Sequence, residues 1–310
     1  MPAQTTARIF NIQRYSIYDG PGVRSLVFFQ GCPLQCLWCS NPEGQSSQTK
    51  LLYRSSRCVH CGLCVNACPE GLHALVGSPA RHAVAHQGCT GCGACVRACP
   101  EQALALSGEE KTLDDILDIV LTDRDFYETS DGGLTLGGGE PLLQWQAAAV
   151  LLRACRAEGI NTAMETSGHA APDIVRQLAP HVDLFLYDLK HMEPAQHKKL
   201  TGVDNALILA NLSWLLNNDC KVRVRMPLVN GCNTNMDEMR ARVAFLEPWK
   251  AAPNFLGVDL LPYHRMGVGK YVQLGMAYTL DADAVVSERD LTAIQALFRD
   301  AGMNVAIIRH

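Results

Sequence analysis

The sequence predicts an α/β fold: a mainly parallel sheet with helices outside, open or closed into a barrel, that carries a small inserted domain. Two observations predict it. From Leu134 onward, short apolar runs alternate with amphipathic stretches, and such alternation builds parallel strands joined by helices. A cysteine-rich internal repeat interrupts this rhythm after the first apolar run. We expect residues 47–106 to form the inserted domain and residues 1–46 and 107–310 to form the main one.

The expected elements follow from local patterns along the chain. A helix is expected over Asp114–Leu121 with Thr112 near its N-cap, another over Gln144–Glu158 closed by Gly159, and a Leu-rich one over Ala206–Asn218. Short apolar runs of this kind are typical of buried strands. The expected strands are Ser25–Phe29, Leu134–Leu136, Thr162–Met164, Val182–Tyr187, Val222–Val229 and Phe255–Leu261.

Composition narrows the class of protein. A chain of 310 residues is long enough for one barrel-sized unit, and 48% hydrophobic residues supply its core. The formal charge of −4 and the lack of a Lys/Arg run argue against nucleic-acid binding. Residues 1–10 contain no apolar signal region, and no apolar run approaches the roughly 20 residues of a membrane span. We expect a cytoplasmic protein without a membrane partner.

Fourteen cysteines suggest metal ligation, because a large chain without an export signal is expected in the reducing cytosol. Eleven of them fall in three tight groups. Two groups are copies of C-x2-C-x2-C-x3-C-P offset by 31 positions, the spacing of bacterial two-cluster ferredoxins, in which the fourth cysteine crosses to the other cluster. Paired zinc knuckles are the alternative, but they need no third cysteine at this spacing. We assign one 4Fe-4S cluster to Cys58, Cys61, Cys64 and Cys99, and another to Cys89, Cys92, Cys95 and Cys68.

The third group, Cys32, Cys36 and Cys39, has the spacing C-x3-C-x2-C and directly follows the first expected strand. With three thiolates, one iron of a cubane stays open, and catalysis at a metal needs such an open position. A fourth ligand from a distant cysteine is the alternative. The candidates for it are Cys155, Cys220 and Cys232, which are otherwise expected as small buried hydrophobes.

This loop, with Trp38 just before its last cysteine, resembles the signature of the radical S-adenosylmethionine enzymes. The whole chain is similar to the activating enzymes of glycyl radical enzymes, and its two-cluster insert resembles the subgroup that activates dehydratases, decarboxylases and C–N or C–S lyases. Further matches occur in family order: Asp19-Gly20-Pro21-Gly22-Val23-Arg24, Gly137-Gly138-Gly139-Glu140-Pro141, Asp188-Leu189-Lys190, Arg225 and Leu261-Pro262-Tyr263-His264.

The resemblance implies a partial (β/α)6 barrel of the TIM type, with the catalytic cluster on Cys32, Cys36 and Cys39 at the strands' C-terminal ends. Local chemistry agrees, since glycines let a backbone edge approach a ligand and Glu140 can accept a bond from its ammonium group. Each match alone is ordinary, so the inference rests on their joint occurrence. The implied cofactor contacts are Trp38, Cys39, Ser40, Gly138, Gly139, Glu140, Asp188, Leu189, Lys190 and His264.

One departure concerns Glu165-Thr166, where pyruvate formate-lyase activases have Asp-Thr beside a monovalent cation. Glu is one methylene longer, which puts a cation site in doubt. The Asp19–Arg24 turn is either a docking edge for the partner protein or an ordinary turn.

The resemblance implies three 4Fe-4S clusters and S-adenosylmethionine as cofactors. It also implies flavodoxin or ferredoxin as the reductant and a glycyl radical enzyme as the protein substrate of a monomeric activase. A 5′-deoxyadenosyl radical would then remove hydrogen from a backbone glycine of that partner. Choline trimethylamine-lyase is the favoured client. The alternative clients are isethionate sulfite-lyase and a glycerol or diol dehydratase. The alternative functions of the chain itself are a radical enzyme acting on a small molecule or peptide, a plain electron-transfer protein, and a zinc-stabilised binding protein.

Overall fold

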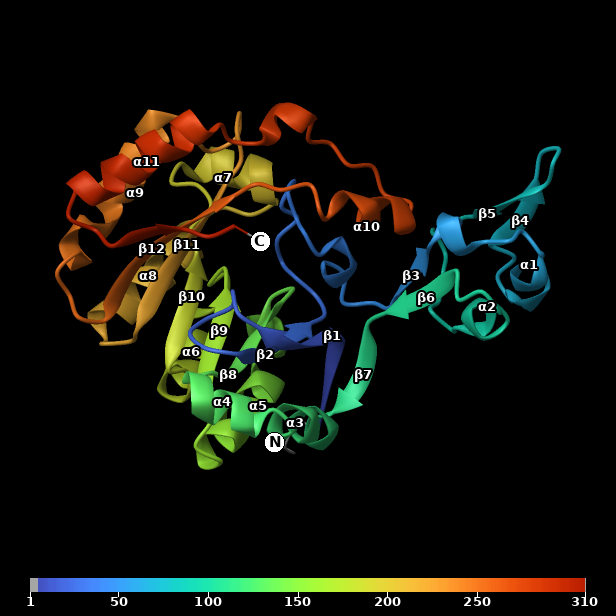
Figure 1. Ribbon diagram of the computed structural model, residues 1–310, viewed down its shortest axis with the longest axis horizontal. Coiled ribbons are helices and arrows are strands. Elements are labelled where there is room, and N and C mark those ends of the chain that lie inside the picture. The colour runs from blue at the N-terminus through green and yellow to red at the C-terminus, as the bar shows by residue number, and fades with distance from the viewer. Residues whose placement is uncertain (1–4, 310) are drawn as a thin grey trace.

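The computed structural model describes residues 5–309. Residues 1–4, which belong to the segment expected to lack a signal peptide, and residue 310 lie outside this range. The main sheet has the strand order β13-β12-β11-β10-β9-β8-β2-β1-β7 (Figure 1). Its strands are β1 (Thr6–Ser16), β2 (Arg24–Phe29), β7 (Glu109–Thr112), β8 (Gly133–Gly138), β9 (Asn161–Thr166), β10 (Leu184–Asp188), β11 (Val222–Leu228), β12 (Phe255–Pro262) and β13 (Val305–Ile307).

The six expected strands correspond to β2 and β8 to β12, which pair in parallel in chain order. The prediction of an α/β partial barrel is therefore confirmed. Three further strands were not expected: β1 pairs antiparallel with β2, β7 pairs antiparallel with β1 at one edge, and β13 pairs parallel with β12 at the other edge. β7 is polar and β13 is very short, so pairing with a neighbour makes them strands, whereas β1 alternates and buries Ala7 and Ile9 in the main core.

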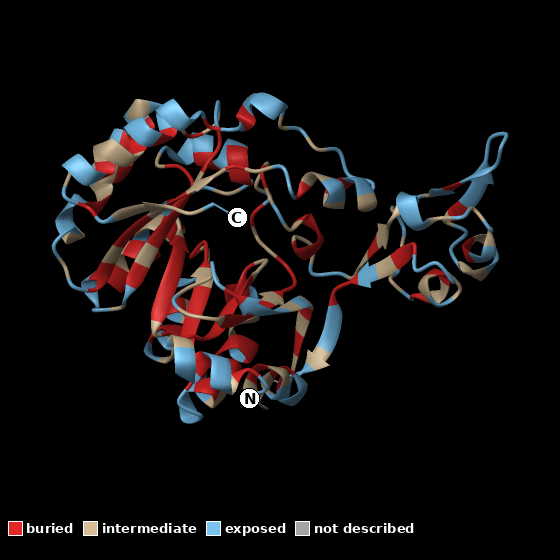
Figure 2. Ribbon diagram, viewed as in Figure 1, coloured by how far each residue is buried: buried red, intermediate tan, exposed pale blue. Residues whose placement is uncertain are grey.

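Most helices outside the cysteine-rich repeat lie along the outside of the curved sheet, but α10 (Val268–Gln273) lies toward the repeat (Figure 1). Buried residues are concentrated on the strands and on the helix faces that pack on them, where the main core lies (Figure 2). Thr112 caps α3 as expected, because its hydroxyl accepts a bond from the Asp115 N–H at 3.1 Å. The helices outside the repeat are α3 (Leu113–Leu121), α4 (Arg124–Ser130), α5 (Trp145–Ala157), α6 (Pro172–Leu178), α7 (Pro194–Thr201), α8 (Ala206–Asn217), α9 (Met236–Leu246), α10 (Val268–Gln273) and α11 (Glu288–Asp300).

The inner face of the curved sheet carries charged side chains. Val224 and Met226 on β11 are fully buried in the main core. Because side chains alternate along a strand, Arg223 and Arg225 point to the opposite face. There Arg223 donates to the Asp259 carboxylate of β12 at 2.6 Å. The interior of the partial barrel is therefore polar and suited to a charged ligand.

The cysteine-rich repeat forms a small separate part of the molecule beyond the edge of the main sheet (Figure 1). The antiparallel pair of β3 (Lys50–Tyr53) and β6 (Leu104–Ser107) connects it to the sheet. A hairpin of β4 (His73–Val76) and β5 (Arg81–Val84) and two short helices, α1 (Leu63–Ala67) and α2 (Ala94–Arg97), complete it. No helix among residues 5–309 is both long and apolar enough to cross a bilayer.

Candidate active site and iron–sulfur centres

The loop after β2 holds the three-cysteine group at the C-terminal ends of the parallel strands. Its backbone is fixed from two sides: the Cys32 N–H donates to the Gln45 carbonyl at 2.9 Å, and the Gln35 N–H donates to the Thr201 carbonyl at the end of α7 at 2.7 Å. The loop therefore spans the space between β2 and α7, and its shape is set by backbone contacts that no motif encodes.

The three thiols converge in a buried space. Burial raises the pKa of Cys36 to about 12, and burial also raises the pKa values of Cys32 and Cys39. The charges of Cys36 and Cys39 also raise the pKa of Cys32, and the charge of Cys39 raises that of Cys36, as expected of groups that lie close together. Buried thiolates without a cation are costly, so this donor set fits a metal cluster that takes up three sulfur ligands.

The other three cysteines lie in different surroundings. Cys155, on α5, is fully buried in the main core, as expected of a small hydrophobe. Cys220 is only half-buried and lies 3.5 Å from the Asn218 carbonyl. Cys232 is also half-buried and packs on the hydrophobic cluster that Trp38 and Cys36 contact. Cys232 is therefore the strongest remaining candidate for a fourth ligand.

Gly138 and Gly139, at the end of β8, lie too close to neighbouring backbone to carry a side chain. A Cβ on Gly138, whose φ is +100°, would lie 2.7 Å from the Phe28 Cα, and one on Gly139 would lie 2.2 Å from the Gly31 carbonyl oxygen. The Glu140 N–H donates to that same carbonyl at 2.8 Å. The expected close approach thus brings the end of β8 against the cysteine loop and fixes the loop's starting point.

Glu140 has protein partners for both carboxylate oxygens. It is 1% exposed and accepts bonds from the Thr166 hydroxyl at 2.7 Å, the Ser167 hydroxyl at 2.6 Å, the Ser167 N–H at 2.9 Å and the Leu142 N–H at 3.2 Å. We expected this carboxylate to accept from a ligand's ammonium group. That contact stays a prediction, and within the chain the carboxylate ties the end of β8 to the end of β9, because a buried charge needs such a set of donors.

A charged pair lies at the end of β10, beside the cysteine loop. The Lys190 ammonium donates to the Asp188 carboxylate at 2.6 Å and is 7% exposed. Burial alone would lower the pKa of Lys190, but the charges of Asp188 and Cys36 outweigh it and raise that pKa. Leu189 between them is buried in the core, and its N–H donates to the Arg225 carbonyl at 2.8 Å.

A buried polar network holds the backbone of this segment in place. The Lys190 carbonyl accepts from the Asn233 amide at 3.0 Å and from the Arg242 guanidinium at 2.7 Å. Arg242 is fully buried and also donates to Glu238, four residues earlier on α9, at 2.8 Å. Sequence reasoning missed these residues, because an i,i+4 Glu–Arg pair is typical of an exposed helix surface.

The last segment of the chain covers the cysteine loop. Trp38 is buried against Tyr263, and His264 follows at the end of β12, where burial lowers its pKa. A Cβ on Gly267 would lie 3.0 Å from the Ser40 Cα, so the two backbones pass close together. On α10, Lys270 forms an ion pair with the Glu43 carboxylate at 2.6 Å. No motif pointed to Lys270.

The residues at the doubtful cation site have partners within the chain. The Glu165 carboxylate contacts the Arg225 guanidinium, which also lies 3.8 Å from the Asp19 carboxylate. The Thr166 hydroxyl donates to Glu140. Glu165, Arg225 and Asp19 thus form a charged group on the inner face of the sheet. Arg225 on β11 lies next to Asp188 on β10.

The Asp19–Arg24 turn has strong structural requirements. A Cβ on Gly22 would lie 2.3 Å from the Ser130 carbonyl oxygen, and φ at this residue is +68°. Arg24 is fully buried and donates to the Leu134 carbonyl and the Thr135 hydroxyl, both at 2.6 Å. Gly22 and Arg24 therefore serve the turn itself.

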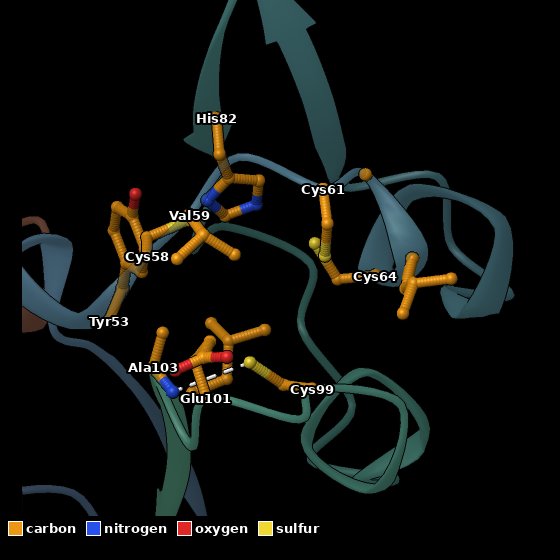
Figure 3. Close-up of a pocket in the computed structure, with 12 residues that line it drawn as sticks. Tyr53, Cys58, Val59, Cys61, Cys64, His82, Cys99, Glu101 and Ala103 are labelled. Atoms are coloured by element: carbon orange, nitrogen blue, oxygen red, sulfur yellow. Dashed lines mark hydrogen bonds between the residues drawn. The ribbon is translucent and has the colours of Figure 1, made fainter.

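The repeat brings its eight cysteines together in two sets of four. One cavity, with an empty volume of about 350 Å³, is lined by Cys58, Cys61, Cys64 and Cys99 (Figure 3). A second one, of about 310 Å³, is lined by Cys68, Cys89, Cys92 and Cys95. Each set takes its fourth cysteine from the other repeat. The donor sets fit two cubane clusters with crossed ligands.

Comparisons with known proteins agree with this chemistry. Residues 85–246 match the radical S-adenosylmethionine superfamily, residues 53–106 match a 4Fe-4S dicluster domain, and residues 18–68 match a 4Fe-4S single cluster domain. A crystal structure of Streptococcus suis SuiB bound to precursor peptide SuiA is similar in fold, with a TM-score of 0.50 and 17% identity over 66% of this chain and 43% of that one.

Two relatives carry the similarity beyond the fold. The choline trimethylamine-lyase activating enzyme of Oleidesulfovibrio alaskensis is 53% identical over 98% of both chains. The isethionate sulfite-lyase activating enzyme of Desulfovibrio desulfuricans is 43% identical over 86% of both chains. The chain therefore belongs to the glycyl-radical-enzyme activating enzymes of the radical S-adenosylmethionine superfamily.

Proposed function

We propose that the chain activates choline trimethylamine-lyase by forming a radical on one of its backbone glycines. The 53% identity to an activating enzyme of that name supports this client over others. The observation that carries the chemistry is the convergence of three buried thiols beside the Lys190–Asp188 pair. Such a site offers sulfur ligands for a cluster and a cation for a ligand carboxylate.

The proposed cofactor set is three 4Fe-4S clusters and S-adenosylmethionine. The barrel, residues 1–46 and 107–310, holds the catalytic cluster on Cys32, Cys36 and Cys39, and the insert, residues 47–106, holds the other two. When bound, the catalytic cluster supplies the electron that cleaves S-adenosylmethionine to methionine and a 5′-deoxyadenosyl radical. Flavodoxin or ferredoxin is the proposed source of electrons, and the activase is proposed to act as a cytoplasmic monomer.

The chain's own residues bind and orient the cofactor in this proposal. Lys190, fixed by Asp188 and by the Arg242 network, binds the carboxylate of S-adenosylmethionine by a charge-assisted bond. The partner's glycine loop enters the polar inner face of the sheet beside Asp19. The further proposed contacts are Trp38, Cys39, Ser40, Gly138, Gly139, Glu140, Leu189 and His264, with Glu140 acting mainly by positioning.

The Lys190→Ala variant tests this binding role. Losing a buried charge-assisted bond is expected to weaken S-adenosylmethionine binding by about 10- to 100-fold, while iron content stays the same. Anaerobic equilibrium dialysis with labelled S-adenosylmethionine measures the change. Lys198→Ala, at an exposed position on α7, is the matched control and should bind normally. An unchanged affinity in Lys190→Ala would remove Lys190 from the site.

The client is tested by offering the reduced activase separate glycyl radical enzymes under anaerobic conditions. Electron paramagnetic resonance is expected to show a glycyl doublet with choline trimethylamine-lyase and much less with isethionate sulfite-lyase, the second candidate because of the 43% identity. A stronger doublet with isethionate sulfite-lyase or with a diol dehydratase would reassign the client. Absence of S-adenosylmethionine cleavage with any partner would favour a plain electron-transfer protein.

A further inference from the structure

Two histidines joined by a hydrogen bond lie on the hairpin between the two cysteine repeats. His73 on β4 and His82 on β5 are 4% and 7% exposed. Their ring centroids are 5.1 Å apart, and the ring planes differ by 21°. The Nδ1 of His73 lies 2.9 Å from the Nε2 of His82. One proton must therefore lie between these two nitrogens, with one ring as donor and the other as acceptor.

The pair lies between the two four-cysteine cavities. His82 lines the cavity of Cys58, Cys61, Cys64 and Cys99, and Figure 3 shows its ring extending from the hairpin toward that cavity. His73 lines the other cavity. A nitrogen of each ring lies within 4.8 Å of the Cys64 Sγ. The two histidines thus lie between the two cavities, with one ring lining each of them.

The hydrogen bond between the rings determines what His82 presents to its cavity. The Nδ1 of His82 is buried and has no hydrogen-bond partner among residues 5–309. If His73 is the donor, a neutral His82 carries its own proton on Nδ1, and that proton needs an acceptor. If His82 were the donor, its Nδ1 would present a bare lone pair to an anionic cluster, which is unfavourable.

We propose that His82, fixed by His73 as the Nδ1–H tautomer, donates a hydrogen bond to a sulfur of the cluster bound by Cys58, Cys61, Cys64 and Cys99. This inference rests on the proposed ligand sets of the insert. A donor to a cluster sulfur stabilises the reduced, more negative state and raises the reduction potential. The two insert clusters are therefore unequal, although their cysteine motifs are copies of each other.

The test uses the full chain with Cys32, Cys36 and Cys39 all replaced by alanine, so that only the insert clusters titrate. The proposal expects His82→Phe to lower the ratio of reduced to oxidised cluster about tenfold for one cluster at a fixed applied potential, the factor that one such bond contributes. The other cluster should keep its ratio. Redox titration followed by electron paramagnetic resonance measures both, alongside iron content.

Two further variants separate hydrogen bonding from packing. His82→Asn places an amide N–H near the position of Nδ1 and should restore most of the ratio. His86→Phe changes a histidine outside both cavity linings and should leave both ratios unchanged. If His82→Phe retains its iron and neither ratio changes, or if both ratios change equally, the proposal is wrong.

If His82→Phe loses iron, the ratio of reduced to oxidised cluster in His73→Phe tests the proposal. That variant keeps His82 but removes the partner that fixes its tautomer, so the same single cluster should become harder to reduce. An unchanged ratio there would overturn the proposal. A parent chain without iron in the insert would instead contradict the proposed insert clusters. Failure of the proposed clusters can therefore be told apart from failure of the proposed His82 hydrogen bond.

Discussion

Replacing Cys32, Cys36 or Cys39 with alanine is expected to abolish S-adenosylmethionine cleavage, by at least about 1,000-fold. Each thiol is buried among the others, so a missing one leaves a cluster with two thiolates and little reason to stay bound. Iron should fall only to about two thirds, because the eight cysteines of the insert are untouched. Release of 5′-deoxyadenosine with dithionite as reductant measures the activity.

Cys220→Ser provides the matched control for these variants. Cys220 is half-buried at the end of α8, with its sulfur near a backbone carbonyl, and it should be replaceable without loss of iron or cleavage. Cleavage at the normal rate in any of the three alanine variants would contradict the assignment of the catalytic cluster. A full loss of iron would contradict the independence of the insert.

Gly139→Ala should disable the catalytic site of a chain that still folds. The added Cβ would lie 2.2 Å from the Gly31 carbonyl oxygen and 2.8 Å from that of Gly44, and both belong to backbone that frames the cysteine loop. The end of β8 and this loop must therefore separate. We expect cleavage to fall by at least about 100-fold, because displacement of a catalytic group by about 1 Å has this effect.

Gly269→Ala tests whether any added methyl group has this effect. Gly269 lies within α10, and a Cβ there would meet no atom within 4 Å. The variant should cleave normally and gain about 0.5–1 kcal/mol of helix stability. Circular dichroism would show that both variants fold. Normal cleavage in Gly139→Ala would mean that the end of β8 does not fix the cysteine loop.

The sequence predicted the six core strands because each is a mostly apolar run that packs on the main core. It did not predict β1, β7 or β13, which extend the sheet beyond these six strands at its two ends. The cysteine sets were predictable because ligand spacing is local. The donors around Glu140 were not, since Thr166 and Ser167 lie 26 and 27 residues away along the chain. The polar network beneath Lys190 needs α9 docked on the sheet, which no local pattern shows.

The structure and the family membership bear differently on the alternative functions and on the alternative fourth ligand. A zinc-stabilised protein and a simple electron carrier do not account for the barrel or for family membership. Cys232 is the one alternative that geometry strengthens, because it packs on the same hydrophobic cluster as Cys36. The proposed activity therefore depends on whether that sulfur or a ligand takes the fourth position on the catalytic cluster.

Electron-nuclear double resonance on the reduced enzyme tests this most directly, with S-adenosylmethionine labelled with 15N in its amino group and 17O in its carboxylate. We expect strong couplings from both labels, since amine and carboxylate would bind the iron without a thiolate. The couplings should persist in Cys232→Ala. Absence of coupling in the parent chain, combined with its appearance in Cys232→Ala, would show that Cys232 occupies the position and would contradict the account.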